Sequence, residues 1–329
     1  MSNTITATIF IPTYNGENDH LEECLKAVFE QKVDFKYDVM VWDSESTDGT
    51  KDILKKFGKK YTNFKWKTIK KADFSHGTTR QLAAEKSKGE YMVYLSQDAV
   101  PANENWLTEM LNPFKISEKI VAVVGRQTPR RICFPAMKYD IIGTFSHQGI
   151  NDATTIWRRY NENNRGNYTE ETFYSDVCSA APRDFLLNKI GYKPVKYAED
   201  YQYGLDIIDA GYLKAYNGRA VVEHSNDVKL SEYKKRMFDE VYNTRKNSGI
   251  TNRFTMLNVI KNTLKQSVLN FFKIVRDSDY SRKRKLYWVF VNPLFILERN
   301  RGIRLGNLVD LNDNNDKYSL EKEREKTDE

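Results

Sequence analysis

The sequence predicts an α/β fold: a mostly parallel β-sheet with flanking helices, followed by a C-terminal helical segment. Short apolar runs that suit buried strands alternate with stretches of helical spacing, an alternation typical of parallel sheets with crossover helices. Polar loops follow three of these runs. With 329 residues, 40% of them hydrophobic, the chain is long enough for one large domain and an appendage.

The first hundred residues alternate strands with helices. Residues 8–12 form an apolar, β-branched run that predicts a buried strand, and residues 21–31 carry apolar side chains at helical spacing. The other predicted strands in this region are residues 37–42, 64–69 and 91–95, and the other predicted helices are residues 51–57 and 78–88.

The pattern becomes less regular in the middle of the chain. Residues 121–125 predict a strand, 126–170 read as irregular, 197–210 as a helix and 220–224 as a strand that ends in His224. We therefore expect three parts: an α/β domain over residues 1–228, a basic helical segment over 229–311, and a polar, disordered tail over 312–329.

The basic charge is concentrated in one segment. Residues 229–304 hold 18 Lys and Arg against 6 Asp and Glu, within a chain of net charge +7, so we expect an anionic partner there. No run reaches the ~20 apolar residues of a membrane span. A basic cluster at 282–285 followed by aromatic residues suits the surface of an anionic membrane. Two alternatives are a helix packed on the domain and a contact between copies of the chain. No nucleic-acid-binding motif is present, and we expect no nucleic-acid partner.

The spacing of the cysteines and the composition of the N-terminus indicate the cellular compartment in which the protein works. Cys24, Cys133 and Cys178 are widely spaced and form no CxxC pair, which favours a reducing environment. Residues 1–7 lack the basic region of a secretory signal. We expect a cytoplasmic protein, peripheral at the inner face of the cell membrane.

Three polar clusters follow predicted strands, at residues 13–16, 43–48 and 97–98. The carboxyl ends of parallel strands share one edge of a sheet, where ligands bind, so we expect these clusters to meet. The chain has neither a GxxxxGK[ST] loop nor a GxGxxG fingerprint, which disfavours kinases and dehydrogenases.

Several side chains could carry chemistry, each with a plainer alternative. Asp98 could hold a divalent cation on a diphosphate or form an Asx-turn. Asp43 could contact a base or ribose, or cap a helix. Of the adjacent Glu199 and Asp200, one could act as a general base, or both could begin a helix favourably. His224 could bind a metal or be structural.

A further candidate anion site lies at residues 74–80, which read FSHGTTR. Gly and hydroxyl residues at a helix N-terminus favour phosphate, and Arg80 could add a bidentate contact beside His76. An ordinary capped helix is the alternative.

Four motifs, read together, resemble the family-2 glycosyltransferases of the GT-A fold, a Rossmann-like architecture. They are IPTYNG at residues 11–16, VWDSESTDGT at 41–50, FSHGTTRQLAAEKSKGEYMVYLSQDAVP at 74–101, and AEDYQYGLDI at 198–207. The third is similar to bacterial rhamnosyltransferases, in which an F-x-H-G-x-T-R element precedes a strand and a Q-D-A loop. The metal loop reads Ser96-Gln97-Asp98, so only the last Asp of the usual Asp-x-Asp is present.

The resemblance implies a role for each site residue. Asp200 would be the catalytic base, with Glu199 as a second candidate, and Asp98 would bind Mg²⁺ or Mn²⁺ with His224 completing the metal site. Thr13, Tyr14 and Asp43 would line the nucleobase pocket, and the remaining nucleotide-sugar contacts would be Asn15, Ser46, His76, Arg80 and Gln97.

The resemblance also implies a reaction for the domain over residues 1–228. This is inverting transfer of L-rhamnose from dTDP-β-L-rhamnose to a polyprenyl-linked saccharide acceptor, a precursor of cell-wall or capsular polysaccharide. A family-2 transferase with a UDP-hexose donor, and a nucleotidyltransferase-type α/β enzyme, are the alternatives.

Overall fold

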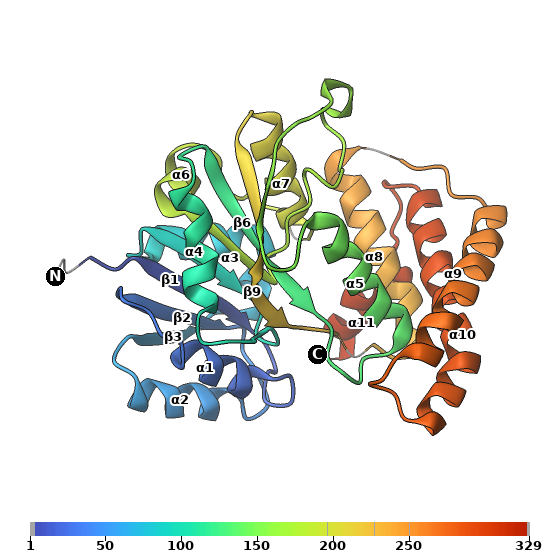
Figure 1. Ribbon diagram of the computed structural model, residues 1–329, viewed down its shortest axis with the longest axis horizontal. Coiled ribbons are helices and arrows are strands. Elements are labelled where there is room, and N and C mark those ends of the chain that lie inside the picture. The colour runs from blue at the N-terminus through green and yellow to red at the C-terminus, as the bar shows by residue number, and fades with distance from the viewer. Residues whose placement is uncertain (1–3, 196, 227, 250, 328–329) are drawn as a thin grey trace. The chain divides into compact units, whose positions relative to one another are not determined.

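The computed structural model describes residues 4–195, 197–226, 228–249 and 251–327 (Figure 1). The chain forms two compact units, one of residues 1–128 with 144–224 and one of residues 129–143 with 225–329. The sequence prediction put a boundary at residue 228 and gave residues 129–143 to the first part.

The first unit is built on one sheet with the strand order β3-β2-β1-β4-β8-β6-β9-β5, and β7 pairs with β9. The predicted α/β fold with a mostly parallel sheet is confirmed, with antiparallel pairing where β8 lies between β4 and β6 and where β5 and β7 pair with β9. The strands are β1 (Ala7–Thr13), β2 (Tyr37–Asp43), β3 (Phe64–Thr68), β4 (Tyr91–Leu95), β5 (Val100–Pro101), β6 (Ile120–Thr128), β7 (Thr154–Trp157), β8 (Cys178–Pro182) and β9 (Leu213–Glu223).

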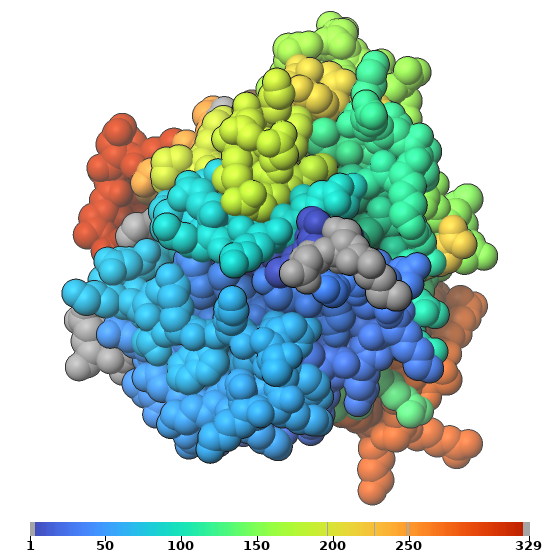
Figure 2. Space-filling model, turned by 90° about the vertical axis from the view of Figure 1, so that its left-hand side faces the viewer, coloured from blue at the N-terminus to red at the C-terminus, as the bar shows by residue number. Residues whose placement is uncertain are grey.

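Helices cover the sheet of the first unit. The apolar positions of α1, namely Leu21, Cys24, Leu25 and Val28, are buried at the spacing that predicted them. In the space-filling view of one face, α2 and β3 (light blue) lie below α3 and α6 (Figure 2). The helices are α1 (Leu21–Phe29), α2 (Thr50–Lys60), α3 (His76–Lys86), α4 (Trp106–Leu111), α6 (Arg183–Asn188) and α7 (Glu199–Asp209), with 3-10 turns at Lys71–Asp73, Asn112–Lys115 and Glu162–Asn164.

Residues 126–170, which the sequence suggested to be irregular, contain the helix α5 (Pro135–Gln148) and the strand β7. Their order depends on distant partners. The buried Lys214 ammonium on β9 donates to Gln148 Oε1 at 3.1 Å and to the Phe173 carbonyl at 2.6 Å. Burial lowers the pKa of Lys214 well below its ordinary value. Local spacing carries no sign of such contacts.

The second unit contains α8 (Leu230–Ser248), α9 (Met256–Arg276), α10 (Arg282–Leu308), a 3-10 turn (Asp316–Tyr318) and α11 (Leu320–Thr327). Residues 312–327 of the segment predicted to be a disordered tail therefore contain helical structure, and residues 328 and 329 lie outside the described residues. The reason is a distant cap: Asp239 Oδ2 on α8 accepts the backbone N–H groups of Leu320 at 2.8 Å and Glu321 at 3.1 Å. In the described part of the chain, no helix has the length and apolarity to cross a bilayer.

Gly302 lets α10 approach α8 closely. A Cβ at this position would lie 2.4 Å from the Lys234 carbonyl oxygen and 2.8 Å from Met237 Cβ. Gly302→Ala should therefore lower the free energy of unfolding by about 1–3 kcal/mol, measured by urea denaturation. Gly143→Ala on α5 is the matched control, because its Cβ would meet nothing within 4 Å. Equal stability of the two variants would contradict this packing.

Candidate active site

The loops that follow β1, β2 and β4 are hydrogen-bonded to one another at one edge of the sheet. The three strands are parallel neighbours, so their carboxyl ends share this edge. The Asn15 backbone N–H donates to Ser46 Oγ at 2.8 Å, which joins the first loop to the second. The Tyr14 backbone N–H donates to Gln97 Oε1 at 2.9 Å, which joins the first loop to the third. The three polar clusters therefore meet as the sequence predicted.

Several side chains that were predicted to contact the nucleotide form hydrogen bonds within these loops. Asp43 is fully buried, as is Thr13 beside it in the sheet, and both Asp43 carboxylate oxygens lie 3.3 Å from the Ser46 backbone nitrogen. Gln97 Nε2 donates to the Tyr14 carbonyl at 3.1 Å and to Asp19 Oδ2 at 2.7 Å. In this conformation Asp43 and Gln97 hold the loops together through hydrogen bonds. Because Asp43 is buried, a ligand would contact the surface of the loops that covers it.

Tyr14 remains half-buried and has a cationic neighbour. Lys71 Nζ donates to the Tyr14 hydroxyl at 3.0 Å and lies 4.6 Å from the centroid of its ring. An aromatic ring beside an ammonium group suits a nucleotide, because the ring can stack on a base and the cation can attract phosphate. Sequence reasoning missed Lys71, since the run 65–71 is rich in lysine and nothing local singles it out.

Asp98 and His224 form a pair at the ends of β4 and β9. Asp98 Oδ2 lies 3.2 Å from His224 Nε2, and both side chains are about nine-tenths buried. His224 Nδ1 lies 3.0 Å from Gln127 Oε1, while Gln127 Nε2 donates to Ser175 Oγ. Both ring nitrogens of His224 therefore face an oxygen atom, Gln127 Oε1 at Nδ1 and Asp98 Oδ2 at Nε2.

This pair fits a divalent cation. Two acceptor atoms that face each other repel unless a proton or a cation lies between them, and an oxygen and an imidazole nitrogen suit Mn²⁺ or Mg²⁺. Among the described residues, no group of three or more His, Cys, Asp or Glu side chains is arranged to hold a metal. A cation here would need further ligands, and the oxygens of a diphosphate are suitable.

Arg80 lies beneath the Glu-Asp element. Its guanidinium is nearly buried, with Nη1 2.6 Å from Glu199 Oε1 and Nε 3.1 Å from Asp176 Oδ2. Arg80 Nη1 also lies 3.1 Å from His76 Nδ1, and burial, then Arg80, lower the pKa of His76 to about 3. His76 is therefore neutral and accepts from Arg80.

These contacts bear on the predicted anion site at residues 74–80, which stays a prediction. Arg80 is held by two buried carboxylates, so it is not placed to grip a phosphate. The start of α3 is also occupied, because the Gly77 backbone N–H and the Ser75 hydroxyl both donate to the Val195 carbonyl, at 3.2 and 3.1 Å. In this structure Arg80 joins α3 to Asp176 and Glu199.

Asp200 is half-buried at the start of α7. Its Oδ1 accepts the Tyr201 backbone N–H at 2.8 Å, and its Oδ2 lies 3.4 Å from the Asp176 backbone nitrogen. Burial, then the Asp176 carboxylate, raise the pKa of Asp200 to about 7. Burial also raises the pKa of Glu199, to about 8, although Arg80 pairs directly with Glu199 and opposes that rise. The two carboxyls differ in access: Glu199 is buried in its ion pair with Arg80, whereas Asp200 is half-buried. Asp200 is therefore the carboxylate that an acceptor hydroxyl can reach more easily.

The segment that begins β8 connects Asp200 to the Asp98 loop. The Ser96 backbone N–H donates to the Val177 carbonyl at 3.1 Å. Asp176, which precedes Val177, has its backbone nitrogen 3.4 Å from Asp200 Oδ2. Asp176 is fully buried and accepts from the Tyr192 hydroxyl at 2.8 Å and the Ser179 hydroxyl at 2.6 Å. Sequence reasoning missed Asp176, because its importance comes from partners far along the chain.

Comparison with known proteins bears on the family of this chain. A model described as "Glycosyl transferase family 2" matches residues 8–190. The chain belongs to glycosyl transferase family 2. Among the relatives of this family-2 glycosyltransferase, the O-antigen chain rhamnosyltransferase WbaN of Salmonella anatum is 30% identical over 235 residues, 70% of each chain. The O-antigen chain rhamnosyltransferase RfbN of Salmonella typhimurium is 28% identical over 234 residues, again 70% of each.

Solved structures share the fold of this family-2 glycosyltransferase. A mannosyltransferase from Pyrobaculum calidifontis, in complex with GDP-Man and Mn²⁺, has a TM-score of 0.55 at 16% identity, with 92% of this chain and 88% of that one covered. TarS from S. aureus, in complex with UDP-GlcNAc, has a TM-score of 0.51 at 16% identity and coverages of 93% and 77%. The predicted GT-A fold is confirmed, and membership of the family decides against the nucleotidyltransferase alternative.

Removing the Arg80 charge should destabilise the first unit. Arg80→Met leaves Asp176 and Glu199 as buried carboxylates without their cation, which should cost about 3–5 kcal/mol in urea denaturation. Adding Asp176→Asn and Glu199→Gln removes the uncompensated charges and should restore part of the loss. If Arg80→Met alone unfolds at the wild-type urea concentration, the guanidinium does not hold this element.

Proposed function

We propose that this family-2 glycosyltransferase moves L-rhamnose from dTDP-β-L-rhamnose to a lipid-linked polysaccharide precursor, with inversion at the anomeric carbon. The observation that carries the proposal is the position of Asp200, a half-buried carboxylate with a raised pKa joined through Asp176 and Val177 to the Asp98 loop. The rhamnosyltransferase relatives WbaN and RfbN support the choice of sugar.

Asp200 acts as the general base in the proposed reaction. Its carboxylate takes the proton of the acceptor hydroxyl while that oxygen forms a bond to the anomeric carbon. The bond from the anomeric carbon to the diphosphate oxygen breaks in the same step, and the diphosphate leaves with the electron pair. Arg80 pairs with Glu199 and holds the start of α7 in place, so that the Asp200 carboxylate keeps one orientation.

The nucleotide is proposed to lie against the loops after β1 and β2. Tyr14 offers an aromatic ring there and Lys71 offers a cation. Thr13, Asn15 and Ser46 belong to these loops, and the Asn15 N–H donates to Ser46 Oγ. Asp98 and His224 would hold a divalent cation, Mg²⁺ or Mn²⁺. When bound, the cation stabilises the negative charge that develops on the leaving diphosphate.

A UDP-hexose donor is the second candidate. The poly(ribitol-phosphate) β-glucosyltransferase of Bacillus spizizenii is 34% identical over 211 residues, 60% of this chain and 31% of that relative. The proposed acceptor is a saccharide on a polyprenyl diphosphate. Such a substrate is membrane-borne, which calls for a protein that works at the inner face of the cell membrane.

Calorimetry with a set of donors tests the proposed function. The wild-type chain is titrated with dTDP-rhamnose, UDP-glucose, UDP-galactose and UDP-N-acetylglucosamine, each in the presence of Mg²⁺ or Mn²⁺. We expect dTDP-rhamnose to bind at least about tenfold more tightly than any UDP-sugar. Tighter binding of a UDP-hexose would show that a UDP-hexose, and not dTDP-rhamnose, is the donor. If no nucleotide sugar binds, the proposal is overturned.

Asp200→Asn should abolish transfer while leaving donor affinity within about twofold, because the amide keeps the shape and loses the base. Asp184→Asn, an exposed change on α6, is the matched control and should be fully active. Turnover of Asp200→Asn near that of the control would exclude Asp200 as the base.

The rate should depend on pH through Asp200. The base works when deprotonated, and its pKa is raised to about 7. We therefore expect kcat to level off above pH 7 and to fall about tenfold for each unit of pH below 6. A rate that stays flat down to pH 5 would show that no group with a raised pKa supplies the base.

Loss of either partner in the Asp98–His224 pair should weaken binding of the cation. In Asp98→Asn, the concentration of Mn²⁺ that gives half-maximal donor binding should rise about tenfold or more, because a neutral amide is a weaker ligand. His224→Gln should shift it in the same direction. Wild-type Mn²⁺ dependence in both variants would place the cation elsewhere.

A further inference from the structure

The helix α9 is amphipathic, and its apolar side faces outward. Between the buried residues Val259 and Ile274, the inner positions are polar: Asn270 is buried, and Asn262, Thr263, Gln266 and Ser267 are half-buried. One of them, Thr263, accepts a hydrogen bond from Asn300 of α10 at 3.2 Å. The large exposed apolar residues are Met256, Leu257, Ile260, Leu264, Val268, Leu269, Phe271, Phe272 and Val275.

This orientation is the reverse of that in an ordinary surface helix, which turns its apolar stripe to the core and its polar face to water. Leu257 is 73% exposed and Leu264 63% exposed, and both lie on one continuous stripe. Proteins that stay in water rarely display so large an apolar patch unless something binds it.

The charged residues of α9 are all basic. Lys261, Lys265, Lys273 and Arg276 of α9 are exposed, and α9 contains no acidic residue. The two acids of the next turn are paired with other residues of the unit: Lys138 Nζ lies 2.8 Å from Asp277 and 2.8 Å from Asp279, and Arg131 lies 3.1 Å from Asp279. No exposed carboxylate of α9 offsets the four cations.

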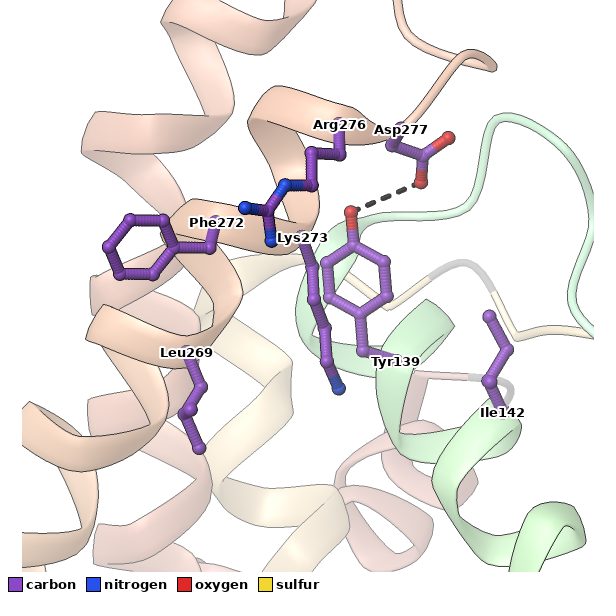
Figure 3. Close-up of a pocket in the computed structure, with 7 residues that line it drawn as sticks. All are labelled: Tyr139, Ile142, Leu269, Phe272, Lys273, Arg276 and Asp277. Atoms are coloured by element: carbon purple, nitrogen blue, oxygen red, sulfur yellow. Dashed lines mark hydrogen bonds between the residues drawn. The ribbon is translucent and has the colours of Figure 1, made fainter.

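The start of α10 continues this pattern. Residues 282–285 are all basic, the first acidic residue of the helix is Glu298, and Leu286 and Phe290 are 63% and 71% exposed. A groove of about 760 Å³ also lies between α9 and α5 (Figure 3). Ile142, Leu269 and Phe272 line it, with Lys273 and Arg276 beside them. Apolar surface edged by cations occurs in both places.

We propose that the outer face of α9, with the start of α10, is a docking surface for an anionic lipid bilayer, in which α9 lies along the interface. Its apolar stripe enters the acyl region while its cations meet the lipid phosphates. A second copy of the chain fits less well, because pairing this face with itself would bring cations against cations. The proposal goes beyond the proposed catalysis and does not depend on the donor.

Flotation with lipid vesicles tests this surface on the full chain. Wild type should bind vesicles of phosphatidylglycerol and phosphatidylcholine in equal parts at least about tenfold more tightly than vesicles of phosphatidylcholine alone, and less so in high salt. The combined variant Leu257→Gln, Leu264→Gln and Val268→Gln should lose about tenfold or more of this affinity. Lys261→Gln with Lys265→Gln should weaken binding to the anionic vesicles only.

The matched control carries Leu82→Gln, Ile116→Gln and Ile150→Gln. These are three apolar-to-Gln changes of the same kind, at exposed positions of the first unit. It should bind like wild type, and all variants should keep the wild-type melting temperature. Equal binding of wild type to both vesicle types, or undiminished binding of the α9 variant, would overturn the proposal. So would light scattering that shows a dimer of wild type but a monomer of the α9 variant, because a second copy would then cover the face.

Discussion

The ion pair between Arg80 and Glu199 is the interaction on which the geometry of the candidate active site depends. It joins residues 119 positions apart in the chain and fixes α3 to the start of α7 in a nearly buried environment. Arg80 also reaches Asp176 at the start of β8. Asp176 and Glu199 pair with this guanidinium, and Asp200 lies beside them. Burial near these carboxylates raises the pKa of Asp200 to about 7, which suits the base that we propose.

The positions of β1 to β4 and the meeting of three loops could be predicted because both depend on local patterns. A buried parallel strand reads as a short apolar run, and polar residues that follow such runs must gather at one edge. Asp98 and His224 were expected together from the family resemblance, and the structure places them 3.2 Å apart. Their role in binding a cation stays a prediction.

The roles of Arg80, Asp176 and Asp43 could not be obtained from the same patterns. Arg80 precedes its partner by more than a hundred residues, so its local surroundings at a helix start favoured phosphate instead. Asp176 follows no motif, and its function as a partner of Arg80 requires the antiparallel insertion of β8 between β4 and β6. For α9, spacing predicts an amphipathic helix but does not say which side faces the protein. Here the polar side packs on α10, and the apolar side is left at the surface.

Diffraction from crystals soaked with Mn²⁺ and dTDP tests the central claim most directly, that Asp98 and Asp200 serve a single site at the carboxyl edge of the sheet. The anomalous signal of manganese should lie within bonding distance, about 2.2 Å, of both Asp98 Oδ2 and His224 Nε2, with the diphosphate on its other side and Asp200 facing the space beyond the terminal phosphate. Manganese bound away from this pair, or a diphosphate on a different face of the first unit, would contradict the account.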